Sequence, residues 1–224
     1  MNKTILILVE GQTEERFVKD VLNPELPGLW FVPTIVVTKE VVSGPNKKGG
    51  MTSYTKFKRD LFRLLKNTDK IITTMVDYYR LPDDFPGMEN RPENASPEDR
   101  VTHVEQQICL DLSKPKNFLP YLSLHEFEAC LFSSSTVLPK TVIATHPQEE
   151  KFRKMCEAVE TPEMMNERPN QSPSKRILSI FPEYNKVIHG STAAKRIGLE
   201  NIRRACPHFD SWLHSLKKMA KLNI

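Results

Sequence analysis

The sequence is poor in the residues that several common kinds of site require. It has only 8 glycines among 224 residues, which leaves little material for glycine-rich cofactor loops. Its 4 cysteines lie far apart without paired spacing, which argues against a zinc site and a disulfide framework. The apolar run near the start, Ile5–Val9, is too short for a signal peptide or a membrane span. With 39% apolar residues, we expect a soluble cytoplasmic globular protein that makes no membrane contact.

Charge is plentiful but unevenly distributed along the chain. The formal net charge is only +4, yet Gln171–Ile224 and Lys39–Lys70 are both strongly basic. Between them, Asp77–Glu105 is acidic. This order could place a polyanion beside a group of carboxylates, or it could reflect ordinary solvated helix faces.

Apolar periodicity divides the chain into two parts. We predict strands at Thr4–Val9, Leu29–Thr38 (with Pro33 at an edge or a bulge), Lys70–Val76 and Phe118–Leu124. Helices are predicted at Thr13–Leu22, at Ser53–Asn67, from Ser96 onward and at His125–Phe132. Beyond Thr136 the pattern indicates helices only. The order predicts an α/β fold, with a mostly parallel four-stranded sheet flanked by helices in residues 1–135 and a helical C-terminal region, 136–224, packed on it.

Acidic residues follow three of the four predicted strands. Glu10 follows the first strand, Asp77 ends the third, and Glu126 follows the fourth. Ligand sites of open parallel sheets lie beyond the carboxyl ends of the strands, so we expect these acids to converge. Converging carboxylates repel one another unless a cation lies between them, and hard oxygen ligands suit Mg²⁺ or Mn²⁺.

Further acids near these positions have two interpretations. Glu10 and Glu14 could serve the site, or could favour the N-terminus of the following helix. Glu126 and Glu128 alternate at a helix start and cannot both face one point, and we favour Glu126 because it is nearer the strand end. Asp77 ends an otherwise apolar strand, where an acid is costly unless it is paired or liganded.

Two pairs of basic residues are candidates for phosphate contacts. Lys47 and Lys48 lie in the glycine-rich loop Gly44–Gly50, which lacks the ending of a nucleotide-binding P-loop and could equally be a surface loop. Lys175 and Arg176 lie in the first turn of a predicted helix, where the helix dipole disfavours cations. A phosphate or an acidic partner would remove that conflict.

Several motifs together resemble a known family. The segments are Val9–Glu14, Val76–Gly87, Leu124–Ala129, Pro173–Arg176 and Pro207–Phe209. They are similar to an uncharacterised bacterial Toprim-like family, domain of unknown function 4276 (DUF4276). The first of them, together with Asp77, resembles the Toprim domain of topoisomerases, DnaG-type primases and overcoming-lysogenization-defect nucleases.

The resemblance implies roles for individual residues. Glu10 would be the general acid/base or a metal ligand, and Asp77 would bind a divalent metal during phosphodiester chemistry on nucleic acid. Toprim domains usually carry a second aspartate at the position that Tyr79 occupies here. Asp83 or Asp84 could fold back to supply that carboxylate, or only one metal ion would bind.

Three functions therefore follow from the sequence. The first is a Mg²⁺- or Mn²⁺-dependent nuclease acting on DNA or RNA, which the resemblance links to ATPase partners in phage defence or repair. The second is a catalytically inactive binding module that docks an ATPase or nucleic acid. The third is a small-molecule phosphohydrolase, which would bind its substrate without a steep salt dependence.

Overall fold

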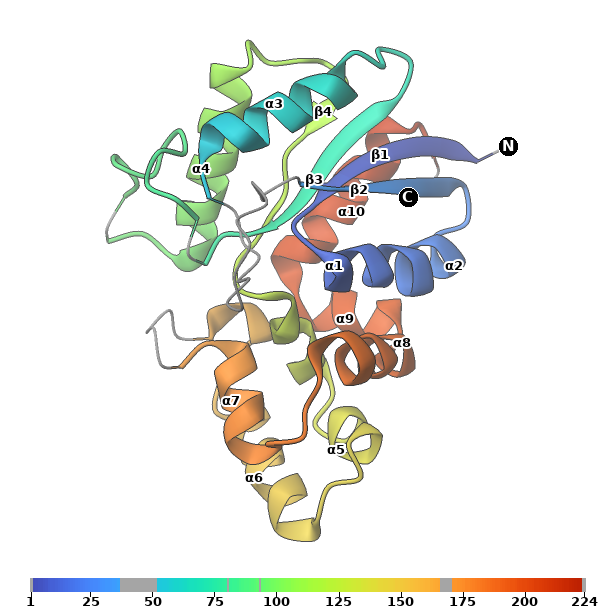
Figure 1. Ribbon diagram of the computed structural model, residues 1–224, viewed down its shortest axis with the longest axis vertical. Coiled ribbons are helices and arrows are strands. Elements are labelled where there is room, and N and C mark those ends of the chain that lie inside the picture. Colours follow the sequence, from blue (N-terminus) through green and yellow to red (C-terminus); the bar gives the residue numbers. More distant parts are fainter. Residues whose placement is uncertain (1, 37–51, 80, 93, 166–170, 223–224) are drawn as a thin grey trace, which may run out of the picture.

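The computed structural model describes residues 2–36, 52–79, 81–92, 94–165 and 171–222 (Figure 1). At its centre is a parallel sheet of strands ordered β2-β1-β3-β4, with β5 also paired to β3. The strands are β1 (Lys3–Val9), β2 (Leu29–Ile35), β3 (Ile71–Asp77), β4 (Phe118–Leu119) and β5 (Leu122–Ser123). The predicted α/β fold with a mostly parallel sheet is confirmed.

Both faces of the sheet are covered by helices, which is why the central strands read as unbroken apolar runs. On one face α3 (Tyr54–Leu65) and α4 (Pro97–Asp111) pack against alternate side chains such as Leu8 and Ile72. Ser53 and Ser96 accept hydrogen bonds from the first-turn amides of these two helices and so define their starts.

The opposite face is covered by helices from both ends of the chain. A continuous helical segment is built from α1 (Gln12–Phe17), the π-helical turn η1 (Val18–Leu22) and α2 (Asn23–Glu25). It shares a core with α10 (Pro207–Met219) and with β1 side chains such as Ile7. The helix was predicted to end at Leu22, but it continues to Glu25, because Pro24 is tolerated in the first turn of α2.

The predicted fourth strand is interrupted. Pro120 lacks the N–H group that a continuous ladder needs, so β4 and β5 are two short strands. The Thr74 hydroxyl of β3 fills the break, because it accepts a hydrogen bond from the Tyr121 N–H (2.8 Å) and donates one to the Tyr121 carbonyl (2.8 Å). The helix expected at His125–Phe132 is instead the 3₁₀ helix η2 (Phe127–Ser133).

The rest of the chain is helical, as the sequence predicts. The elements are α5 (Val137–Thr141), α6 (His146–Glu157), η3 (Pro162–Met164), α7 (Pro173–Ile180), the π-helical turn η4 (Lys186–Gly190), α8 (Ser191–Ile197) and α9 (Leu199–Ala205). Helices α5 to α7 extend below the sheet in Figure 1, whereas α10 returns to pack on the sheet. The domain boundary at residue 135 stays a prediction.

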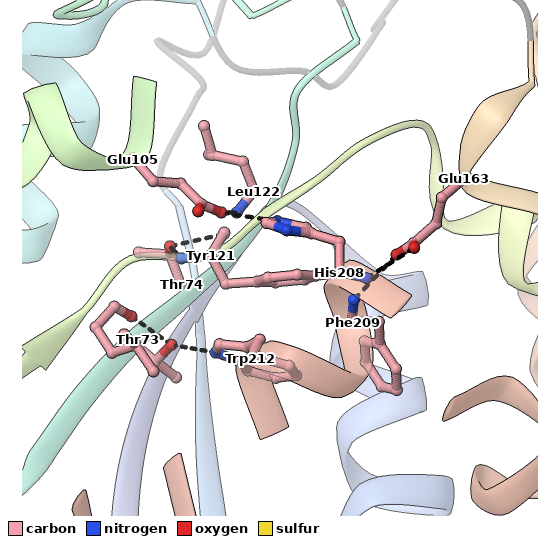
Figure 2. Close-up of polar contacts among 10 residues, drawn as sticks. Thr73, Thr74, Glu105, Tyr121, Leu122, Glu163, His208, Phe209 and Trp212 are labelled. Carbon is pink, nitrogen blue, oxygen red and sulfur yellow. Dashed lines mark hydrogen bonds and ion pairs between the residues drawn. The ribbon is translucent and has the colours of Figure 1, made fainter. Parts of the chain in front are cut away.

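Polar contacts fix α10 to the sheet (Figure 2). The Trp212 indole N–H donates to the Thr73 hydroxyl on β3 (2.9 Å), and its ring stacks on Tyr121 at 4.5 Å. Glu163 accepts the backbone N–H groups of His208 (2.9 Å) and Phe209 (3.0 Å) at the start of the helix. The His208 ring reaches Glu105 of α4 at 3.1 Å. None of the described helices has the length and apolar character that a membrane crossing needs.

Candidate active site

Two predicted site residues meet at the carboxyl edge of the sheet. Strands β1 and β3 are neighbours in parallel register, with Val9 opposite Met75, so their ends lie side by side. Glu10 follows β1, and its Oε2 accepts a hydrogen bond from the backbone N–H of Asp77 at 3.3 Å. The sheet topology therefore brings Glu10 within side-chain reach of Asp77, as the sequence predicts.

Glu14 joins this pair from the first turns of α1. It is one helical turn beyond Glu10 and is only 4% exposed. Gly11 leaves space for its carboxylate, because a Cβ atom at residue 11 would lie 3.3 Å from the Glu14 Oε2. A larger residue at position 11 would therefore press directly on the site.

A fourth carboxylate and a cation arrive from later parts of the chain. Glu128 of η2 is fully buried. Lys186 of η4 places its Nζ 3.1 Å from the Glu128 Oε2 and 3.8 Å from the Glu14 Oε1. We call Glu10, Glu14, Asp77 and Glu128 the acid cluster, and Lys186 is its cationic neighbour.

The charges of the acid cluster act on one another. Burial raises the pKa of Asp77 well above its usual value, and the charges of Glu10, Glu14 and Glu128 raise it further, against the opposing effect of Lys186. Burial likewise raises the pKa of Glu128. Burial lowers the pKa of Lys186, but the neighbouring acids, Glu128 first, outweigh that effect and raise it. Lys186 thus offsets part of the repulsion among these carboxylates, and the raised pKa of Asp77 and of Glu128 favours their protonated forms.

The donor atoms of the cluster suit a divalent metal ion. Asp77 Oδ1 and Glu128 Oε1 are buried oxygens without a hydrogen-bond partner in the structure. Such oxygens are hard ligands of the kind that Mg²⁺ and Mn²⁺ prefer. Within the described residues, however, no three acidic, histidine or cysteine side chains are arranged closely enough to hold an ion. These oxygens are therefore of the chemical type that binds a divalent metal ion, but in the structure the ammonium of Lys186 lies beside those of Glu14 and Glu128.

Glu126 has a different local role from Glu128. Its Oε2 accepts the backbone N–H of Ser174 at 3.0 Å, at the start of α7. Its charge also raises the pKa of Glu128, so it lies close to the acid cluster. Glu126 was preferred over Glu128 because it is nearer the strand end, and in the structure it precedes η2, whereas Glu128 lies inside it. Metal binding by Glu126 stays a prediction.

The acids proposed to replace the aspartate missing at Tyr79 lie on the loop after β3. Asp84 accepts the backbone N–H of Tyr54 at 2.9 Å and so caps the start of α3. Asp83 is exposed. The contact of Asp84 leads to α3 and not to the acid cluster, so its role as a second metal ligand, like that of Asp83, stays a prediction.

Of the four basic residues proposed to contact phosphate, two lie within the described part of the chain. Lys47 and Lys48 lie outside the described residues. Lys175 is exposed in the first turn of α7, and the Arg176 guanidinium donates to the Gln171 carbonyl at 2.6 Å. At this helix start the Glu126 carboxylate accepts the Ser174 N–H, an arrangement that the positive end of the helix dipole favours. Phosphate binding by Lys175 and Arg176 stays a prediction.

Sequence reasoning missed Lys186 altogether. It lies in a π-helical turn outside any recognised motif, and nothing about the residues around it indicates a site. Its importance becomes visible only when the fold brings η4 beside α1 and η2. A contact of η4 with α1 supports this placement, because the Arg16 guanidinium donates to the Val187 carbonyl at 3.0 Å.

Comparison with known families identifies the family of this chain. A family model described as "Domain of unknown function (DUF4276)" matches residues 9–217, nearly the whole chain. The chain belongs to this family. The match includes the complete acid cluster of this DUF4276 chain and Lys186, and it confirms the family resemblance predicted from the motifs.

A solved structure with a similar fold is the C-terminal region of the Burkholderia pseudomallei OLD protein. It covers 98% of the DUF4276 chain and 99% of its own, with a TM-score of 0.51 and 14% sequence identity. This likeness establishes a shared fold and is consistent with the predicted Toprim-like relationship. Among curated proteins, no match was found.

Proposed function

We propose that this DUF4276 protein is a divalent-metal-dependent phosphodiester hydrolase acting on DNA or RNA. The observation that carries the proposal is the meeting of Glu10 and Asp77 at the ends of adjacent parallel strands, with Glu14 and Glu128 beside them. The fold shared with the OLD protein region supports it, since the Toprim resemblance implies nuclease chemistry for this edge of the sheet.

In this proposal the residues of the acid cluster have two different roles. Asp77, Glu14 and Glu128 would have to move closer together to hold a metal ion, which would neutralise the phosphate and stabilise the charge developing in the displacement. Glu10 lies at the rim of the cluster and is less buried than Glu14. Its carboxylate takes the proton of the attacking water as a general base. The backbone N–H of Asp77 orients that carboxylate.

Cleavage assays test the proposal directly. Wild type, Glu10→Gln and Asp77→Asn are incubated with supercoiled plasmid and with labelled DNA and RNA oligonucleotides in Mn²⁺ or Mg²⁺. We expect cleavage by wild type and a loss of about 100-fold or more in both variants. Asp69→Asn is the matched control, because Asp69 is 72% exposed and lies before the opposite end of β3. Equal activity in all four proteins would reject the proposal.

A second candidate is a catalytically inactive module that docks an ATPase or nucleic acid. Two observations favour it: Tyr79 stands where a second Toprim aspartate is usual, and no three ligands are gathered around one point in the described residues. This candidate predicts no heat of Mn²⁺ binding in calorimetry and co-purification with an ATPase. Mn²⁺ binding that is lost in Asp77→Asn would exclude it.

A further inference from the structure

The helix α3 presents positive charge to solvent. The segment from Tyr54 to Lys66 contains five basic residues and a single acidic one, Asp60. The basic residues are Lys56, Lys58, Arg59, Arg63 and Lys66. The Asp60 side chain is only 4% exposed, whereas those of Arg59 and Arg63 are 50% and 65% exposed. A surface of this kind attracts polyanions.

One buried carboxylate holds the two arginines side by side. Asp60 Oδ1 lies 3.2 Å from the Arg59 Nε and 3.1 Å from the Arg63 Nη1. Because two guanidinium groups share one carboxylate oxygen, this contact leaves one positive charge uncompensated. Guanidinium groups held in place in this way are suited to bind phosphate, since their planar forks match its oxygens.

The arginine pair lies on the flank of α3 that faces the edge strand β2. Lys58 lies on the opposite flank, because its ammonium pairs with Asp111 of α4 at 2.7 Å. Asp60 follows Lys58 by two residues, which corresponds to about 200° around an α-helix. Asp60 and its two arginines therefore lie away from α4, on the side of the sheet where β1 and β2 are neighbours.

An aromatic side chain is exposed on the same face of the sheet. Trp30 and Val32 of β2 are 50% and 40% exposed, and Val32 is the parallel partner of Leu6 on β1. Leu6 packs against the core that α3 covers, so Val32 and Trp30 lie on the α3 face as well. In Figure 1 the helix lies toward the β3 side of this face, and β2 forms the other edge.

This surface extends along α3 toward the candidate active site. The helix ends at Leu65, shortly before β3 begins at Ile71, so it runs antiparallel to the strands. Its end therefore lies near the level of Trp30, at the start of β2, and its beginning lies toward the carboxyl edge of the sheet. With 12 residues, α3 is about 18 Å long.

We propose that Arg59, Arg63 and Trp30 form a docking surface for single-stranded nucleic acid, with phosphates on the arginine pair and a base stacked on the indole. This inference rests on the proposed function for the class of its ligand. A single strand is favoured over a duplex, because a base stacks on a side chain only when it is not paired and stacked within a duplex. The strand then follows α3 to the acid cluster.

Fluorescence anisotropy of the full chain in EDTA measures this binding without cleavage. The probes are fluorescein-labelled oligo(dT), oligo(rU) and a DNA duplex of the same length. We expect the tighter of the two single strands to bind about fivefold or more tightly than the duplex, and the comparison of oligo(dT) with oligo(rU) identifies the preferred sugar.

The arginine pair is tested by the double variant Arg59→Gln, Arg63→Gln. We expect its Kd for the single strand to rise about tenfold or more, and the slope of log Kd against log salt concentration to fall by about 1. The double variant Arg153→Gln, Lys154→Gln is the matched control. It removes the same charge from α6, but these cations pair with Glu150 and Glu157, so its Kd should stay within about twofold of wild type.

Tryptophan fluorescence tests the stacking separately. The sequence has 2 tryptophans, and Trp212 is only 4% exposed, so a bound base reaches only Trp30. We expect oligo(dT) or oligo(rU) to quench wild type, and Trp30→Ala to abolish the quenching and raise Kd about fivefold or more with little change in the salt slope. Trp30→Phe keeps an aromatic ring and should retain most of the affinity. Because the Trp30 side chain is half exposed, these variants keep the core intact.

Three results would each overturn the inference: quenching that persists in Trp30→Ala, a duplex bound as tightly as the single strands, or an unchanged Kd and salt slope in the arginine variant. If wild type cleaved nucleic acid in Mn²⁺ while these variants bound it as tightly as wild type, the proposed function would stand and this inference would fall. If the variants weakened binding in EDTA as expected while no protein cleaved nucleic acid, the inference would stand without the hydrolase.

Discussion

Asp77 is a half-buried carboxylate with three acidic neighbours, so its charged form is unfavourable in the metal-free protein. Burial and the charges of Glu10, Glu14 and Glu128 raise its pKa well above the ordinary value. A carboxyl group with a raised pKa in the folded state costs stability as the pH rises from the ordinary pKa to the raised pKa, because over this range the unfolded chain ionises more readily, and the cost is complete above the raised pKa. The site is thus organised for a ligand at the expense of stability.

We therefore expect Asp77→Asn to stabilise the metal-free protein at pH 7.5. The amide removes the unfavourable charge, and a gain of about 1–2 kcal/mol would raise Tm by a few degrees for a chain of this size. The gain should shrink as the pH falls toward the ordinary aspartate value, because wild-type Asp77 then becomes protonated. Thermal denaturation in EDTA between pH 4.5 and pH 8 measures both trends.

The control for this variant is Asp69→Asn. Asp69 is exposed and pairs with Lys70 at 2.9 Å, which lowers its pKa. Its substitution should bring no increase in Tm at any of these pH values. A fall in Tm for Asp77→Asn at pH 7.5 would contradict the electrostatic interpretation of the acid cluster.

At the scale of residues, the sequence predicts acids at strand ends better than it predicts acids on short helices. Glu10 and Asp77 follow from β1 and β3 because parallel pairing fixes which ends meet. The choice between Glu126 and Glu128 depends on where a 3₁₀ helix begins, and neighbouring residues do not determine that. Lys186 could not be predicted, because only long-range packing brings η4 to the cluster.

At the scale of elements, local signals define the helix starts well. The serines before α3 and α4 cap those helices, and the predicted starts lie close to the observed ones because capping depends only on residues a few positions apart. The break between β4 and β5 depends on a distant residue: the Thr74 hydroxyl replaces the ladder partners of Tyr121. From the sequence alone, the apolar run that includes Pro120 is therefore predicted as a single strand.

The Asn23 side chain binds backbone groups of the edge strand β2 that would otherwise be free to pair with another chain. Pro33 was expected at an edge or a bulge, and β2 indeed forms one edge of the sheet. Asn23 of α2 accepts the Phe31 N–H at 2.7 Å and donates to the Phe31 carbonyl at 3.0 Å. This pair of hydrogen bonds imitates a neighbouring strand and leaves fewer backbone groups free for association with another chain.

We expect Asn23→Ala to lower the free energy of unfolding by about 1–3 kcal/mol, because both hydrogen bonds are lost and the Phe31 N–H is left without its acceptor. The variant should also associate more readily at high concentration. Urea denaturation and light scattering measure the two effects. Asn201→Ala provides a matched comparison, since Asn201 is an exposed residue of α9 that donates to the Ile197 carbonyl of α8. Equal stability of the two variants would refute the protective role of Asn23.

At the scale of the whole molecule, the alternation of strands and helices predicts the sheet, because right-handed crossovers leave few other topologies. The packing of α10 against the sheet could not be predicted from this alternation. It depends on partners distant in sequence, such as Trp212 with Thr73 and His208 with Glu105. The Trp212 contact joins the last helix to β3, the strand that carries Asp77, and the His208 contact joins it to α4.

His208 makes this attachment sensitive to pH. Burial lowers the pKa of its ring, but the hydrogen bond and charge of Glu105, helped by the charges of Glu163 and Glu98, outweigh burial and raise the pKa above 6.5. The stabilisation is therefore complete below the unfolded value of 6.5 and is lost as the pH rises through the folded pKa. We expect His208→Gln to be less stable than wild type in urea at pH 6, with the difference diminishing toward pH 9. His214→Gln, an exposed histidine on the same helix, should show no such trend. A stability difference for His208→Gln that stays constant from pH 6 to pH 9 would mean that the ring holds α10 by shape and stacking on Tyr121, and not by its charge.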